Sequence, residues 1–276
     1  MPLSISTNIA SLSAQRSFLT SNAALETSYE RLASGKRINS SSDDAAGLAI
    51  AVDLSSRVSG TNQAIRNVND GISMVQIMDG AFDEVTSILQ RMRDMAVQAA
   101  NGSLSTTEQG YIDTEQSKLV DALNASINQA KFSSKDLVTG SATAVTVSIQ
   151  AGAGTGDTVS VSLSTDSVAS ATQLGVGGLT NFASAANSFI SVIDAAVGKV
   201  ASQRATLGAH QTQLESTVRN LANVAENTAA AAGRVMDTDY AAETANLTKA
   251  QILQQAATSV LAQANAQPQA VLSLLQ

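Results

Sequence analysis

The chain has 276 residues, of which 44% are hydrophobic, so it has room for about two domains and can bury a core. Its formal net charge is −7 and no Lys or Arg lies between Lys135 and Lys199, which argues against a nucleic-acid-binding face; the absence of cysteine excludes disulfides and thiolate zinc sites. No apolar run approaches the length of a membrane span, and the first residues lack the basic and apolar regions of a secretory signal.

Residues 3–34 are predicted to form the first helix. Large apolar side chains recur in it at intervals of seven, in the rows Leu12–Leu19 and Phe18–Leu25–Leu32. Gly35 predicts its C-terminal end. Residues 39–42 then form a polar joint. We expect Ser42 to cap the next helix, with Asp43 and Asp44 in its first turn, where negative charge suits the helix dipole.

The stretch 43–101 predicts an unusually long helix. Apolar residues recur every seven positions in two rows, Val68, Val75, Phe82, Leu89 and Ala96 in one and Met78, Val85, Met92 and Ala99 in the other. This spacing places the side chains along one face of a helix. At roughly 1.5 Å per residue the helix would be about 90 Å long. The two prolines, Pro2 and Pro268, lie outside it. A helix with one long apolar seam needs a partner of similar length.

The segment that follows predicts a third helix and then a β-hairpin. Ser105 and Glu108 have the spacing of a capping box, and the helix they open is expected to end near Lys131. Between about 144 and 164 the apolar residues alternate with small polar ones on both sides of a glycine-rich turn. Period two around such a turn predicts two antiparallel strands.

From about Asn181 to Ala232 the heptad pattern returns. Its main row is Ile193, Val200, Leu207, Leu214 and Leu221. This segment is the predicted partner of residues 43–101, and a chain that returns on itself places the two antiparallel. We expect Gly233 to break the helix and residues 237–239 to cap a last one. The predicted fold class is therefore mainly α, a long antiparallel helical bundle or coiled coil with one small β-hairpin.

No catalytic, cofactor or metal site is predicted. His210 is the single histidine, and it lies in a heptad-patterned helix without the companions that a general base or metal ligand needs. Asp43 and Asp44 suit helix capping better than acid–base chemistry, because adjacent helical residues do not face each other. The glycines of 152–156 lack the lysine and the strand–loop–helix context of a phosphate loop. An enzyme on a helical scaffold is therefore disfavoured.

Several segments of the chain resemble bacterial flagellin. They are SISTNIASLSAQRSF near the start, RLASGKRINSSSDDAAGLAIA at 31–51, NQAIRNVNDGIS at 62–73, QRMRDMAVQAANG at 90–102, LESTVRNLANVAEN at 214–227 and DYAAETANLTKAQILQQAATSVLAQANAQPQAVLSLLQ at 239–276. The resemblance covers about residues 1–140 and 185–276. One departure is KFSSKDLV at 131–138, where the family usually has a Phe-Asn-Gly turn; another is Gln276, where a basic residue is common.

The resemblance implies a structural, non-enzymatic protein that polymerises into the flagellar filament. It divides the chain into the terminal coiled-coil region D0, at 1–42 and 235–276, and the helical rod D1, at 43–234. The short segment between the matching halves implies a form without the outer domains of many family members. The apolar residues expected to drive polymerisation are Leu12, Phe18, Leu19, Leu25, Leu253, Val260, Leu261, Val271, Leu272 and Leu275.

Partners and location also follow from the resemblance. It implies unfolded export through the flagellar type III apparatus to a secreted filament, and contacts with other copies, an export chaperone, and filament cap and hook-associated proteins. It implies no cofactor, no nucleic acid and no membrane insertion. A hook–filament junction protein and a coiled-coil adaptor are the alternatives. The family also carries a patch that a vertebrate Toll-like receptor recognises, which maps here onto Arg91, Met95, Gln98 and Glu115.

Overall fold

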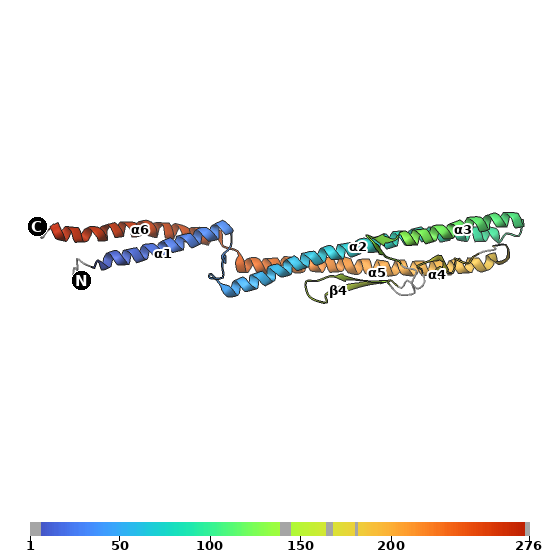
Figure 1. Ribbon diagram of the computed structural model, residues 1–276, viewed down its shortest axis with the longest axis horizontal. Coiled ribbons are helices and arrows are strands. Elements are labelled where there is room, and N and C mark those ends of the chain that lie inside the picture. The colour runs from blue at the N-terminus through green and yellow to red at the C-terminus, as the bar shows by residue number, and fades with distance from the viewer. Residues whose placement is uncertain (1–6, 139–144, 164–167, 180–181, 274–276) are drawn as a thin grey trace. The chain divides into compact units, whose positions relative to one another are not determined.

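The computed structural model describes residues 7–138, 145–163, 168–179 and 182–273. The helices are α1 (Ile9–Ser34), α2 (Ala45–Ala99), α3 (Thr106–Gln129), α4 (Ala171–Leu174), α5 (Phe182–Met236) and α6 (Tyr240–Ser273) (Figure 1). The strands are β1 (Lys131–Phe132), β2 (Lys135–Asp136), β3 (Val145–Gln150) and β4 (Thr158–Leu163). The chain forms two compact units: unit 1 is Met1–Ser56 with Asn227–Gln276, and unit 2 is Arg57–Glu226. The predicted mainly helical class is confirmed.

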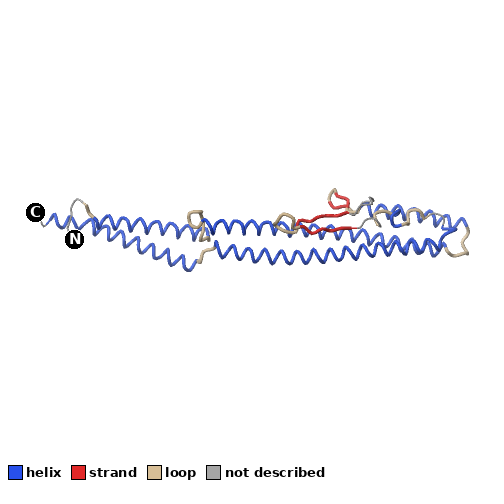
Figure 2. Tube along the Cα trace, turned by 90° about the horizontal axis from the view of Figure 1, so that it is seen from below, coloured by secondary structure: helices blue, strands red, loops and turns tan. Residues whose placement is uncertain are grey.

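In unit 2, α2 and α5 lie side by side, as both views show (Figures 1 and 2). Apolar side chains of the two helices belong to one buried core. Every residue of the two predicted rows of α2 is buried, and so are Ile193, Val200, Leu207 and Leu214 of α5. Two ion pairs at the rim fix the direction of the helices: Arg204 pairs with Asp79, and Arg93 pairs with Asp194, each with a nitrogen–oxygen distance of 2.7–2.8 Å. Ascending numbers on α2 meet descending numbers on α5, so the predicted antiparallel pairing is confirmed.

The third helix begins where the capping box predicted. The Ser105 hydroxyl accepts a hydrogen bond from Glu108 N–H, and the Glu108 carboxylate accepts one from Ser105 N–H at 2.7 Å. Together they satisfy two of the backbone donors that the start of a helix leaves free. The helix buries Ile112, Leu123 and Ile127 against the same core as α2 and α5.

The predicted hairpin is confirmed by the antiparallel pairing of β3 with β4, from Val145 opposite Leu163 to Gln150 opposite Thr158 (red in Figure 2). Its inward residues, Ile149 and Val161, join the core of unit 2. Gly71 on α2 admits Ile149, because a Cβ at position 71 would collide with the isoleucine side chain.

Two elements of unit 2 were not expected from the sequence. Strands β1 and β2 form a second, very short hairpin, in which Ser133 has a φ of 56°. The segment 168–179, which contains α4, buries four large apolar side chains in the core; they are Val168, Leu174, Val176 and Leu179. It is anchored where Ala171 N–H donates to the Asn124 side chain at 3.0 Å and the Lys199 ammonium donates to the Gln173 carbonyl at 3.0 Å.

In unit 1 three predicted helix boundaries are wrong. Helix α1 begins at Ile9, with Asn8 as its N-cap, whereas a start at residue 3 was predicted. Helix α2 begins at Ala45, and its cap is Asp44, whose carboxylate accepts from Gly47 N–H at 2.9 Å. Asp43 lies before the helix and Ser42 does not cap it. Gly233 does not end α5, which continues to Met236. The alanines at 229–232 favour helix, and one glycine costs only about 1 kcal/mol in a helix interior.

Candidate functional site

In unit 1, α1 and α6 form an antiparallel pair whose facing surfaces carry small side chains. Among the described residues, the small side chains buried along the pair are Ser11, Ala14, Ser28, Ala250, Ala257 and Ala264, and the one large buried side chain is Glu243. The three alanines of α6 are seven residues apart, so they form one stripe along that helix. Because these side chains are short, the pair buries little apolar area compared with a seam of leucines.

Polar side chains connect the two helices at several levels. The Asn8 amide donates to the Ala264 carbonyl at 2.7 Å, and the Ser11 hydroxyl donates to the Asn265 side chain at 2.8 Å. Farther along, the Gln254 amide donates to the Asn22 side chain, and the Gln251 amide donates to the Tyr29 hydroxyl at 3.3 Å. Each bond requires one relative position of the two helices, so these bonds fix the register of the pair.

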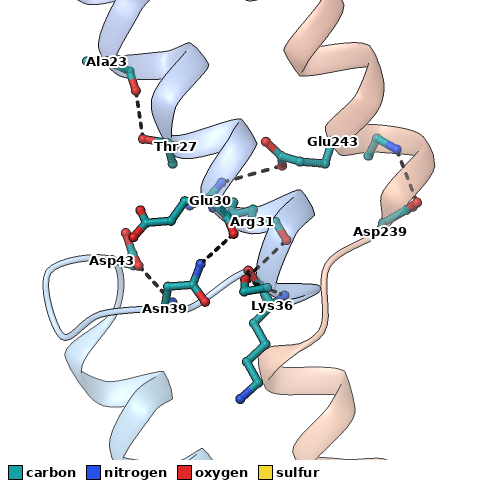
Figure 3. Close-up of polar contacts among 11 residues, drawn as sticks. Ala23, Thr27, Glu30, Arg31, Lys36, Asn39, Asp43, Asp239 and Glu243 are labelled. Carbon is teal, nitrogen blue, oxygen red and sulfur yellow. Dashed lines mark hydrogen bonds and ion pairs between the residues drawn. The ribbon is translucent and has the colours of Figure 1, made fainter.

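An ion pair continues this series toward the joint that precedes α2. The Arg31 guanidinium lies 3.8 Å from the Glu243 carboxylate (Figure 3). Glu243 is only 6% exposed, although it lies in the first turn of α6. A carboxylate this deeply buried needs its cation, because an unpaired charge away from water is costly.

The joint itself is a polar turn closed by hydrogen bonds. The Asp43 carboxylate accepts from the backbone N–H groups of Asn39 and Ser40 at 3.0 and 2.9 Å (Figure 3). Hydrogen bonds to the ionised form hold the pKa of Asp43 below its usual value. The return segment is attached to the same place: Lys36 forms an isolated antiparallel bridge with Asp237, and Arg37 N–H donates to the Met236 carbonyl at 2.6 Å.

The outer surface of the α1–α6 pair is apolar. Leu12, Leu19, Leu253 and Val260, all predicted polymerisation residues, are 57%, 67%, 47% and 52% exposed. Phe18, Leu25 and Leu261 are half-buried. Val271 and Leu272 lie in α6 but their side chains are outside the described residues, as is the whole of Leu275. Exposed leucine and valine side chains grouped on one helix pair are typical of a surface that another molecule covers.

The predicted receptor-recognition residues lie in unit 2, and the structure separates them into two kinds. The Arg91 guanidinium on α2 pairs with the Glu115 carboxylate on α3 at 2.7 Å, and both side chains are about half exposed. The carboxylate raises the pKa of Arg91 further through its hydrogen bond and charge. Gln98 is exposed. Met95, however, is only 2% exposed and packs in the core, so its side chain does not form part of the surface.

The other residues considered for chemistry have structural surroundings. The imidazole of His210 lies 3.3 Å from the Ser162 carbonyl of the hairpin. The glycine-rich loop is closed by Asp157, whose carboxylate accepts from Gly154 N–H at 3.0 Å. Within the described ranges, no three His, Cys, Asp or Glu residues are grouped so that they could hold a metal ion. No helix in those ranges combines the length and apolar character that crossing a membrane requires.

The polar residues that fix the α1–α6 register were missed from the sequence. The alanine stripe of α6 marks the inner face of that helix, which leaves Leu253 and Val260 exposed. Asn8, Asn22 and Asn265 have no such pattern, because a single interhelical hydrogen bond leaves no periodic trace.

Comparison with known proteins gives one consistent result. The model of the bacterial flagellin N-terminal helical region matches residues 5–143, and that of the C-terminal helical region matches residues 190–275. A flagellin of Halalkalibacterium halodurans is 40% identical over 272 residues, covering 99% of each chain. The flagellar filament 33 kDa core protein of Treponema phagedenis is 37% identical over 284 residues, again with 99% coverage of each.

Longer relatives and a solved structure are also similar. Flagellin A of Vibrio anguillarum is 33% identical over an alignment of 380 positions that covers the whole of both chains. The crystal structure of Bacillus cereus flagellin has a TM-score of 0.49 and 29% identity, and the match covers 56% of this chain and 88% of that one.

Proposed function

This chain belongs to the bacterial flagellin family, and on that premise we propose that it polymerises through its terminal helices into the flagellar filament. A filament subunit is a structural component, and no enzymatic activity is proposed. The D0 region of the proposal comprises 1–42 and 235–276, and the D1 region comprises 43–234.

The observation that carries this proposal is the exposed apolar surface of the α1–α6 pair. Leu19 and Val260 are more than half exposed, whereas the described side chains that are buried in the same pair are, apart from Glu243, those of alanine and serine. Burying an exposed leucine or valine contributes about 1.5–3 kcal/mol. Neighbouring copies of the pair that cover these side chains would therefore supply the stabilisation that the inner face lacks. Single helical pairs with so little core are marginal, and we expect the free subunit to order them only on assembly.

Truncation of the chain tests the mechanism. Removal of residues 253–276 deletes Leu253, Val260 and the residues after them while leaving unit 2 intact. The shortened chain should remain soluble and helical by circular dichroism but fail to extend filament seeds in sedimentation and electron microscopy.

A control variant separates loss of the surface from loss of the chain end. Val260→Ser with Leu253→Ser keeps the full length and should also slow assembly, whereas Val224→Ser, at an exposed position of unit 2, should not. Normal filaments from the truncated chain would show that α6 does not drive polymerisation.

The finer parts of the proposal concern delivery. We propose that the chain leaves the cell unfolded through the flagellar type III apparatus, with an export chaperone on its C-terminal region. Filament cap and hook-associated proteins would then be its partners at the filament ends. Support for this comes from family membership.

A hook–filament junction protein is the alternative within the same organelle. The match of the C-terminal family model over residues 190–275 favours a filament subunit. Localisation in intact flagella discriminates the two, because a filament subunit labels the whole filament and a junction protein labels only its base.

Recognition by a vertebrate Toll-like receptor is a second candidate function. The exposed Arg91–Glu115 pair, which joins α2 to α3, favours it, because a planar guanidinium is a frequent anchor of protein interfaces. Arg91→Ala should weaken receptor signalling without changing helicity. Arg93→Ala is the matched control, since Arg93 makes a comparable exposed pair with Asp194. Equal signalling by wild type and Arg91→Ala would remove Arg91 from the surface that the receptor contacts.

A further inference from the structure

The loop between α2 and α3 contains an asparagine followed by glycine, at Asn101 and Gly102. Both residues are exposed, and neither lies in a helix. An asparagine side chain loses its amide when the backbone nitrogen of the next residue attacks the side-chain carbonyl carbon. A glycine in the second position favours this attack, because it has no Cβ to obstruct the approach.

The hydrogen bonds of the loop suit that attack. Ser103 N–H donates to the Asn101 side-chain oxygen at 3.3 Å, which holds the side chain over the backbone that follows it. The same donor would stabilise the negative charge that develops on this oxygen during the attack. Among the described residues, none accepts a hydrogen bond from Gly102 N–H, so the attacking nitrogen is free.

We propose that Asn101 is a site of spontaneous deamidation in the folded protein, with water as the co-reactant. A base removes the Gly102 amide proton, the nitrogen bonds to Asn101 Cγ, and the Cγ–Nδ2 bond breaks with release of ammonia. Water then opens the cyclic imide at either carbonyl, which gives aspartate or isoaspartate. Each event makes the chain one unit more negative than its formal charge of −7.

A second loop asparagine, Asn39, is protected from deamidation by the hydrogen bonds around it. Asn39 precedes Ser40, but Ser40 N–H donates to the Asp43 carboxylate at 2.9 Å, so the attacking nitrogen is engaged. The Asn39 side-chain amide is also held, because it donates to the Glu30 carbonyl at 3.2 Å. The fold therefore protects Asn39 and leaves Asn101 in a reactive geometry, and preorganised approach is a large component of any reaction rate.

The new charge has a structural consequence. Asn101 lies two residues after Ala99, the last residue of α2, at the end of the helix where the backbone dipole is negative. A carboxylate at this position is repelled by the dipole, so deamidation destabilises the last turn of α2. The charge state of this loop therefore records the age of the protein.

The test is peptide mapping by mass spectrometry after the folded, full-length protein is incubated at neutral and mildly alkaline pH. Deamidation should accumulate at Asn101, more quickly at the higher pH, while Asn39 stays intact. Gly102→Ala should slow it by about tenfold. Alanine fits there, because a Cβ at Gly102 meets no atom within 4 Å. Asp43→Ala should accelerate deamidation at Asn39 alone.

A parallel incubation in denaturant separates geometry from sequence. Unfolding should increase the rate at Asn39 by about tenfold and change the rate at Asn101 by far less. An intact Asn101 in the aged folded protein would overturn the proposal. So would an equal rate in wild type and Gly102→Ala.

Discussion

The two units of the chain use the same helical architecture with opposite distributions of apolar side chains. Among the described residues, the large side chains that are completely buried belong to unit 2, with the single exception of Ile38; examples are Phe82, Leu89 and Ile193. Most of the large apolar side chains that remain exposed belong to unit 1, including Ile9, Leu19 and Ile252. Unit 2 is therefore stabilised from within, whereas unit 1 has its apolar surface available for other molecules.

The difference shows that a heptad pattern alone does not tell which face of a helix is the inner one. In α5 the leucine row faces the partner helix. In α6 the alanine stripe does, and Leu253 and Val260 are exposed. Small inner side chains let polar groups such as Asn22 and Gln254 reach across the pair and set its register. We infer that the inner face of unit 1 sets the register of the α1–α6 pair, whereas its outer face binds other molecules.

The two units should differ most when the same charge is introduced into each of them. Leu207 is 1% exposed in the seam of unit 2. Its substitution by glutamate should lower the free energy of unfolding by about 4 kcal/mol or more, because apolar burial is lost and an unpaired charge is buried. Leu19→Glu, at a site 67% exposed in unit 1, should change the stability of the free chain by less than about 0.5 kcal/mol. Urea unfolding followed by circular dichroism measures both, and similar losses would contradict the contrast.

A smaller effect concerns the polar interior of unit 1. Arg31→Met leaves Glu243 buried without its cation, which should destabilise the α1–α6 pair by about 3 kcal/mol. In assembled filaments, where the pair is expected to be ordered, hydrogen exchange at the amides of α6 should speed up while exchange in α3 stays unchanged. The double variant Arg31→Met with Glu243→Leu removes the charge as well and should recover most of the loss. A double variant no better than the single one would mean that the ion pair is not what Glu243 requires.

Acid should affect the two units separately, because among the described residues each unit has one exposed carboxylate whose pKa is lowered by backbone hydrogen bonds. Glu108 caps α3 in unit 2, and Asp43 closes the joint of unit 1. A lowered folded-state pKa contributes stability above the unfolded values, 4.5 for Glu108 and 3.8 for Asp43. That contribution is lost as the pH falls through the lowered pKa.

The matching variants should act on separate units. Glu108→Gln should reduce the acid sensitivity of α3 alone, and Asp43→Asn that of the joint alone, as measured by hydrogen exchange across a series of acidic pH values. If either substitution changed hydrogen exchange equally in α3 and in the joint, the stabilising effect of that carboxylate would not be confined to its own unit.

The smallest expected effect concerns the short hairpin of unit 2. Ser133 has a φ of 56°, a conformation that strains a residue with a side chain, so Ser133→Gly should stabilise unit 2 by roughly 0.5 kcal/mol. Ser134→Gly is the control, since residue 134 does not have a positive φ and should lose stability. Thermal unfolding compares the two, and a lower midpoint for Ser133→Gly would show that the turn is not strained.

Much of the fold could be predicted because long periodic stretches leave little choice. The seam through Phe82 and Leu207 and the Ser105 capping box were all predicted correctly. Other features could not be predicted, because neighbouring residues compete for the same structural role. Ser42, Asp43 and Asp44 can each cap a helix, and only the folded joint, where Asp43 binds Asn39 and Ser40, leaves Asp44 for that role. The segment 168–179 is too short for a periodic pattern, and its burial depends on α3 and α5.

The candidate surfaces were predictable only as far as family likeness reached. Arg91 and Glu115 were named by resemblance, and their ion pair is seen in the structure. Met95 was named with them, yet its side chain is buried in the core of unit 2, and it belongs to neither of the two apolar rows predicted for α2.

The pairing of α1 with α6 also determines the order in which the chain can fold. The bond between Asn8 and Ala264 joins residues 256 positions apart, whereas the longest separation in the rim pairs of α2 and α5 is 125. Closing a longer loop costs more conformational entropy, and contacts between distant residues form late. The caps and hairpins of unit 2 form from neighbours within a few residues. The first helix of the chain is therefore the last to find its partner, and it stays unpaired for as long as the rest of the molecule takes to fold.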